Sequence, residues 1–108
     1  ASAHPQCLSP LEHALALASA ASLHVILPAG NQASDACKWA PARMAAAIVV
    51  GAVDRLDRRM PKSNFGHCVD FHAPGAGLRV AVPGGFEERS RTSAAAAVAA
   101  GVAALVLG

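Results

Sequence analysis

The hydrophobic pattern along the first part of the chain predicts a helix over residues 9–21, SPLEHALALASAA. Apolar residues recur there at three- and four-residue spacing and would share one face of the helix. Ser9 is placed to cap this helix and Pro10 suits its first turn. Glu12, three residues after the cap, completes a capping box.

Short apolar runs without clean alternation then predict buried β-strands, over residues 23–31, 46–53, 68–71 and 78–82. The segments between them are polar or rich in glycine and proline, so we expect loops over residues 32–45 and 54–67 and a turn-rich stretch over residues 83–91. Continuous apolar strands with flanking helices are typical of an α/β fold with a mainly parallel sheet. In such sheets the reactive loops follow the carboxyl ends of the strands.

The last predicted element is a helix over residues 92–107 that is apolar on every side, so we expect it to be buried all round. Thr92 and Ser93 stand at its start, directly after Arg91. Either one of these hydroxyls caps the helix by accepting a free N–H, or Ser93 is a nucleophile whose developing negative charge the helix dipole stabilises. Spacing alone favours the cap.

Composition narrows the class of protein. The 108 residues fit a single domain, but 54% are hydrophobic and only 15% are charged. This apolar load is high for a free-standing domain of this size and is typical of a piece of a larger core. The net charge of +2 is too small to indicate nucleic-acid binding. The apolar run over residues 94–107 is shorter than the roughly 20 residues of a membrane span, and residues 1–8 show no secretory signal pattern.

The chain has three cysteines, Cys7, Cys37 and Cys68. They are too few and too scattered for a zinc site built from CxxC pairs. Two of them can pair and leave the third without a partner.

Four stretches of the sequence together resemble one family of enzymes. In order they are AGN at 29–31, DAC..APAR...AIVVGAVDRLDRR at 35–59, SNFGHCVDFHAPG at 63–75 and SRTSAAAAVAAGVAAL at 90–105. They resemble the C-terminal half of the catalytic domain of subtilisin-like serine proteases (subtilases), nearest to the proteinase K and aqualysin branch. The resemblance runs from about Ser9 to Gly108, and it implies that residues 1–108 are one segment with part of the three-layer α/β fold of subtilisin.

This resemblance implies catalytic roles for two residues. Ser93 falls on the nucleophile of the family's glycine-threonine-serine motif, and Asn31 falls on the asparagine whose amide donates to the oxyanion. A donor aimed at a developing oxyanion lowers the barrier by about 3–4 kcal/mol. Pro28, Ala29 and Gly30 fall on the strand that walls the pocket for the substrate side chain before the cut.

A calcium site is implied by the same resemblance. Asp70, with the backbone carbonyls of Ala45 and Ala47, falls where proteinase K-like members hold a calcium ion. Hard oxygen ligands of this kind suit calcium. The ion would be structural, and no catalytic cofactor is expected.

Cys37 and Cys68 fall on a pair that is disulfide-bonded in aqualysin-like members. In the chain-entropy view, closing a loop of this length stabilises the fold by roughly 3–4 kcal/mol. We therefore expect the disulfide rather than two buried thiols, with Cys7 left without a partner in this chain. The cysteine pair and the family together favour a secreted or extracytoplasmic protein.

The sequence departs from the family pattern around the nucleophile position. Where the family has glycine, methionine, proline and histidine, this chain has Arg91, Ala94, Ala97 and Val98. A long cation beside the nucleophile would crowd the site or shift the backbone. Pro28 also removes an N–H from the pocket strand.

No histidine of this chain stands where the family has its catalytic base. The family's catalytic aspartate and histidine belong to the N-terminal half of the domain, which we expect to precede this chain. We expect His24 to be a satisfied core residue within a strand, and His67 and His72 to lie in a loop or at a strand edge. A serine without a base is a weak nucleophile.

These features predict a segment of a subtilisin-like serine endopeptidase domain that does not hydrolyse peptides by itself. Its partner would be the missing N-terminal half of the domain or another protein chain, with a peptide as substrate in the active form. The alternative is a non-catalytic pseudoprotease or structural module that binds a protein partner. The altered residues around Ser93 favour this alternative, whereas Ser93 and Asn31 themselves favour the enzyme.

Overall fold

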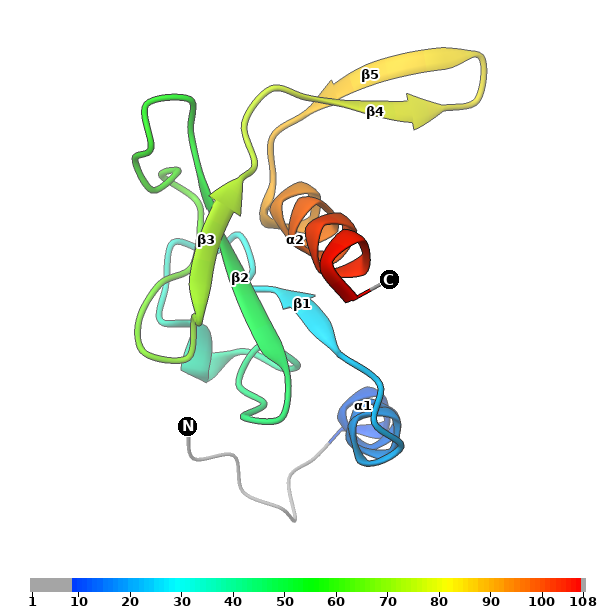
Figure 1. Ribbon diagram of the computed structural model, residues 1–108. Helices are drawn as coiled ribbons and strands as arrows, with labels where there is room; N and C mark the ends of the chain where they lie inside the picture. The colour runs from blue at the N-terminus through cyan, green and yellow to red at the C-terminus, as the bar shows by residue number, and fades with distance from the viewer. Residues whose placement is uncertain (1–8, 108) are drawn as a thin grey trace.

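The computed structural model describes residues 9–107 (Figure 1). In chain order its elements are α1 (Pro10–Ala20), β1 (Ile26–Pro28), the short 3-10 helix η2 (Ala36–Lys38), β2 (Ile48–Val53), β3 (Phe71–Pro74), β4 (Leu78–Val82), β5 (Gly85–Arg89) and α2 (Thr92–Leu107). His4 and Cys7 lie outside the described residues, so the expectation for Cys7 stays a prediction.

The capping box predicted for α1 is confirmed. The Ser9 hydroxyl accepts a hydrogen bond from the Glu12 amide at 3.2 Å, and the Glu12 carboxylate accepts one from the Ser9 amide at 3.0 Å. The same carboxylate is fully buried and pairs with the Arg43 guanidinium through two bonds of 2.8 and 2.6 Å. Hydrogen bonding to Arg43 lowers the pKa of Glu12 to about 2. The first turn of α1 is thereby tied to the loop that leads into β2.

Strands β1, β2 and β3 form a parallel sheet in that order. Successive residues of β2 face opposite sides of this sheet. Val49 packs in a cluster that reaches α1 and the loops, whereas Val50 packs in a second cluster with the first half of α2. The sheet is therefore covered on both faces (Figure 1), which confirms the predicted α/β fold with a parallel sheet flanked by helices.

The third strand lies three residues later than the sequence predicted. Residues 68–71 were expected to be a strand, but pairing with β2 runs from Phe71 to Pro74. The apolar residues that suggested the earlier start have another role. Cys68 forms a disulfide and lies in the cluster around Val49, with Val69 packed against it. The strand begins only where the backbone comes into register with β2.

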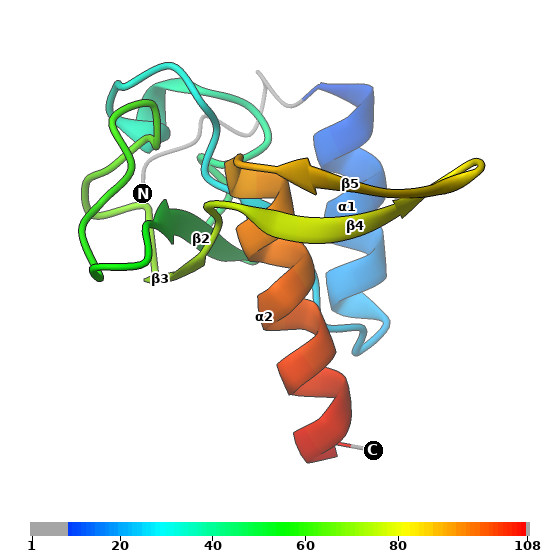
Figure 2. The same ribbon diagram turned by 90° about the horizontal axis from the view of Figure 1, so that it is seen from above.

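Residues 83–91 contain a strand that the hydrophobic pattern did not reveal. β5 pairs antiparallel with β4 across a tight turn at Pro83 and Gly84. All five residues of β5 are exposed, so the strand has no buried face and no hydrophobic period. The hairpin extends away from the parallel sheet (Figures 1 and 2).

The prediction that the last helix is buried on all sides is wrong. Only its first half packs on the sheet, through Ala95, Ala96 and Ala99. Beyond Gly101 the large apolar side chains are exposed, with Leu105 at 86%. The physical reason is length: a helix of 16 residues is about 24 Å long, whereas the strands beneath it are short, and its end runs past them (Figure 2). Within the described part of the chain, neither helix is long and apolar enough to cross a membrane.

Candidate active site

The loop after β1 and the start of α2 are joined by two reciprocal hydrogen bonds. The Gly30 amide donates to the Thr92 hydroxyl at 3.2 Å, and the Thr92 amide donates to the Asn31 side-chain oxygen at 3.1 Å. These bonds link residues that are 61 and 62 positions apart in the chain. They place the Asn31 side chain against the residue that directly precedes Ser93.

The same bonds correct the expectation that Thr92 or Ser93 caps the helix. Thr92 is already helical and fully buried, and its hydroxyl accepts the Gly30 amide rather than an N–H of its own helix. A free N–H at the helix start is instead satisfied from outside, by the Asn31 side chain. The Arg91 carbonyl accepts the Ala95 amide at 3.3 Å. The sequence pattern missed this arrangement because the acceptor comes from a distant loop.

Ser93 is exposed and lines a hollow of about 320 Å³ between the β4–β5 hairpin and α2. Asn31 lines a neighbouring hollow of about 610 Å³, together with Lys62 and Ser90. Arg91 lines both hollows. The two predicted catalytic residues thus line two hollows that share Arg91.

Asn64 is the residue that organises this loop, and sequence reasoning did not single it out. It is fully buried. Its side-chain oxygen accepts the Gln32 and Ser34 amides at 2.9 and 3.0 Å. Its side-chain nitrogen donates to the Ala29 carbonyl at 2.9 Å and to the Gln32 side chain at 2.6 Å. The only signal was its place in SNFGHCVDFHAPG, one of the four stretches that resemble the family.

Gly30 is required by this packing. Its φ of +105° lies in the region that disfavours L side chains. A Cβ at this position would stand 2.5 Å from the Asn64 side-chain nitrogen and 2.6 Å from the Gln32 side-chain oxygen. Any side chain here would therefore displace the Asn64 and Gln32 side chains, which bond to each other beside Asn31.

The segment expected to bind substrate, Pro28 to Gly30, uses its own amides within the fold. The Ala29 amide donates to the Val50 carbonyl at 2.8 Å, and the Gly30 amide donates to Thr92. Pro28 has no amide hydrogen. The Ala29 and Gly30 carbonyls also accept hydrogen bonds within the fold, from the Asn64 side chain and the Asn64 amide, at 2.9 Å each. An extended peptide along this segment would therefore find no free amide there.

The residues expected to hold calcium come just before two adjacent parallel strands. Ala45 and Ala47 precede β2 and Asp70 precedes β3, and the two strands run parallel. The Asp70 carboxylate accepts the Val49 amide at 2.7 Å through one oxygen. One exposed carboxylate and two carbonyls form a donor set of hard oxygens, which has the chemistry that calcium prefers.

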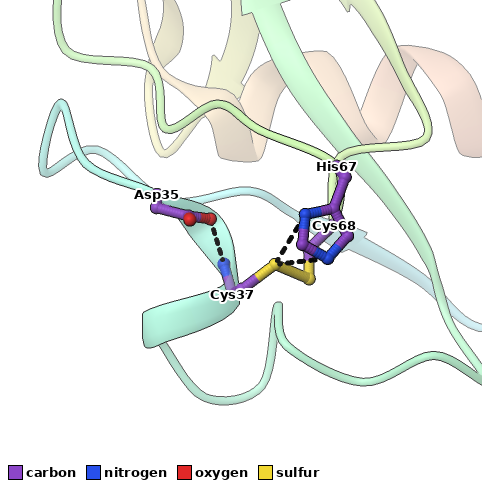
Figure 3. Close-up of a disulfide and its surroundings, with 4 residues drawn as sticks. All are labelled: Asp35, Cys37, His67 and Cys68. Atoms are coloured by element: carbon purple, nitrogen blue, oxygen red, sulfur yellow. Dashed lines mark hydrogen bonds between the residues drawn. A yellow bond between two sulfur atoms is a disulfide. The ribbon is translucent and has the colours of Figure 1, made fainter. Parts of the chain in front are cut away.

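Cys37 and Cys68 form the expected disulfide, with Cα atoms 5.4 Å apart (Figure 3). It joins η2 to the loop before β3, and the Asp35 carboxylate accepts the Cys37 amide at 2.9 Å. The ring of His67 lies against the Cys37 sulfur, with Nε2 at 3.5 Å. The bridge thus pins the loop that follows Asn31 to the segment that carries Asn64.

None of the histidines among residues 9–107 hydrogen-bonds Ser93. His24 is exposed and precedes β1, so the expectation of a core histidine within a strand is wrong. His67 lies in a loop and His72 on β3, an edge strand of the parallel sheet, as predicted.

Comparison with known proteins places this geometry in one family. A family model described as "Subtilase family" matches residues 3–108. The chain is 42% identical over 98 residues to alkaline serine exoprotease A of Vibrio alginolyticus, covering 90% of this chain and 18% of that protein. It is 39% identical over 97 residues to alkaline elastase YaB of Bacillus sp. (strain YaB), covering 89% of this chain and 25% of that protein.

A solved structure supports the same assignment. The crystal structure of a cold-adapted subtilisin-like serine proteinase superposes with a TM-score of 0.87 at 41% identity, over 90% of this chain and 36% of that one. The chain therefore spans only a part of each protein that it matches. Because the four sequence stretches, the parallel sheet and all three comparisons agree, the chain belongs to the subtilase family.

Proposed function

We propose that this chain is the part of a subtilisin-like serine endopeptidase domain that carries the nucleophile, Ser93, and the oxyanion donor, Asn31. One observation carries this proposal. The Asn31 oxygen accepts the Thr92 amide, and this bond fixes the side-chain amide beside the residue that precedes Ser93.

In this mechanism Ser93 Oγ attacks the scissile carbonyl of a peptide, and the charge that develops on the carbonyl oxygen needs donors held in advance. With its oxygen anchored on Thr92, the Asn31 amide group has its Nδ2 hydrogens free to donate. The Ser93 amide at the start of α2 is a second donor, and the helix dipole adds to the stabilisation. Pro28 to Gly30 would wall the pocket for the substrate side chain before the cut.

The proton acceptor for Ser93 would come from outside this chain. Loss of the base from such a triad can lower turnover by about a millionfold, so the isolated chain is expected to be inactive. The partner that supplies the base would be the rest of the catalytic domain.

Asp70 and the carbonyls of Ala45 and Ala47 would hold a calcium ion, which when bound supplies positive charge that ties the starts of β2 and β3 together. The disulfide supports a secreted or extracytoplasmic location. One relative, 44% identical over 68 residues, is named an extracellular serine proteinase from Thermus sp. (strain Rt41A).

A fluorophosphonate, which modifies only activated serines, tests the proposal. We expect no labelling of the isolated chain and labelling after it is combined with the N-terminal part of a relative's catalytic domain. Ser93→Ala is the control and should abolish the signal. Labelling of Ser93 in the isolated chain would contradict the need for an external base.

Arg91 favours a second candidate, a pseudoprotease module that binds a protein partner, because this long cation lines both the hollow of Asn31 and the hollow of Ser93. The variant Arg91→Gly separates the two candidates. If labelling after complementation requires Arg91→Gly, the fold retains the enzyme's geometry and Arg91 blocks it. If neither form is labelled, the endopeptidase proposal fails and the binding module is favoured.

A further inference from the structure

Apart from the candidate active site, the disulfide brings three metal-binding side chains together: Cys37, His67 and Cys68 (Figure 3). Their ligand atoms all lie within 4.8 Å of one another. His67 Nε2 is 3.5 Å and Nδ1 is 3.9 Å from Cys37 Sγ. While the two sulfurs are bonded to each other, they cannot serve as thiolate ligands.

The spacing matches what zinc requires. Tetrahedral zinc has Zn–S bonds of about 2.3 Å and Zn–N bonds of about 2.0–2.1 Å, so a sulfur and a nitrogen ligand lie about 3.5 Å apart and two sulfurs about 3.8 Å apart. The distance from Cys37 Sγ to His67 Nε2 already has the first of these values. The sulfurs need only separate, which breaking the S–S bond permits.

The surroundings hold the ligands and leave one side open. The Asp35 carboxylate is directed at the Cys37 amide and away from the sulfurs (Figure 3), so it orients this cysteine without competing for a metal. Cys68 is buried, whereas the His67 ring is exposed. Three protein ligands with solvent on one side is the arrangement in which zinc keeps a water as its fourth ligand.

We propose that reduction of the Cys37–Cys68 disulfide turns this cluster into a zinc site, with Cys37, Cys68 and His67 as ligands and water in the fourth position. An external dithiol gives two electrons and two protons: the S–S bond breaks, two thiols form, and the dithiol becomes a disulfide. Zn²⁺ then displaces the two thiol protons into solvent, and neutral His67 binds through Nε2. The oxidised chain has no such site.

The test uses the full chain with Cys7→Ser, so that no third thiol competes. The protein is reduced with a water-soluble phosphine, which takes an oxygen from water to become the phosphine oxide and does not hold zinc as a dithiol would. Co²⁺ is titrated in, and thiolate-to-cobalt charge transfer is followed by absorbance. We expect one Co²⁺ per reduced chain, its displacement by one Zn²⁺, and no such band for the oxidised chain.

The variant His67→Ala separates this site from binding by two free thiols. It should weaken Zn²⁺ binding by at least about 10-fold, because loss of even an outer partner of a metal ligand costs 10–100-fold. His24→Ala, which removes another exposed histidine, should leave binding unchanged. Circular dichroism reports whether the reduced chain keeps its fold. Equal binding by His67→Ala, equal binding by the oxidised chain, or no binding by the reduced chain, folded or unfolded, would each overturn the proposal.

Discussion

The loop after β1 and the β4–β5 hairpin both meet the start of α2, but they are held there in different ways. The loop is fixed by side chains from distant segments, because Asn64 and Thr92 bond to it across 30 to 62 residues of sequence. The hairpin is held by its own ladder and by contacts between near neighbours, such as the Arg79 guanidinium 4.7 Å from the Phe86 ring. The loop therefore depends on the whole body of the fold, here taken as residues 9–75 with the first half of α2, whereas the hairpin depends mainly on itself.

The largest effect on stability should follow from removing the Asn64 side chain, which holds the loop after β1. Asn64→Ala deletes four side-chain hydrogen bonds and leaves the buried Ala29 carbonyl and the part-buried amides of Gln32 and Ser34 without their partners. We expect a loss of about 3 kcal/mol or more in the free energy of unfolding, measured by chemical denaturation. The matched hairpin variant Glu87→Ala removes an exposed ion pair and should change stability by no more than about 0.5 kcal/mol. Similar losses for the two variants would show that the body and the hairpin do not differ as described.

A smaller effect should come from pH, through the buried pair of Glu12 and Arg43. The folded-state pKa of Glu12, about 2, lies below its ordinary value of 4.5, so its contribution to stability is complete above pH 4.5 and is lost as the pH falls toward 2. Thermal unfolding followed between pH 7 and pH 2 should show this decline. Glu12→Gln should be less stable at pH 7 and should decline less over the same interval; a parallel decline would assign the acid sensitivity to other carboxylates.

The smallest effect should come from the hairpin. Arg79→Ala removes the contact with the Phe86 ring, which at an exposed site is worth about 0.5–1 kcal/mol. Hydrogen exchange read by mass spectrometry should show faster exchange over β4 and β5 and unchanged protection in β1 and β2. Faster exchange at β2 in this variant would mean that the hairpin is coupled to the body after all.

The features that the sequence predicted are local, and the features that it missed depend on contacts between separate segments. The capping box of α1 and the apolar run of β2 are local patterns, and both were read from the residues alone. The start of β3 at Phe71 depends on register with β2, and β5 depends on pairing with β4, so neither has a local signature. The exposure of the end of α2 could not be read either, because it depends on how far the sheet extends beneath the helix.

The same distinction holds for the candidate site. Asn31 and Ser93 were found through motifs, but the contacts that join them were not. The hydroxyl of Thr92 was expected to act within its own helix, and it bonds to Gly30 instead. No local sequence pattern shows that Asn64 holds the loop after β1, because the role of a buried asparagine is set by the hydrogen-bond partners around it.

The Asn64 network also bears on how the protein ages chemically. An asparagine loses ammonia when the next backbone nitrogen attacks its side-chain carbonyl, and the resulting aspartate would set a negative charge against the Ala29 carbonyl and the Gln32 side-chain oxygen that now accept hydrogen bonds. That next nitrogen, of Phe65, donates to the Ser34 carbonyl at 3.1 Å, which holds it away from the attack. The folded loop thus protects Asn64 from this reaction. Conversion of Asn64 to aspartate would occur in those molecules in which the loop had opened.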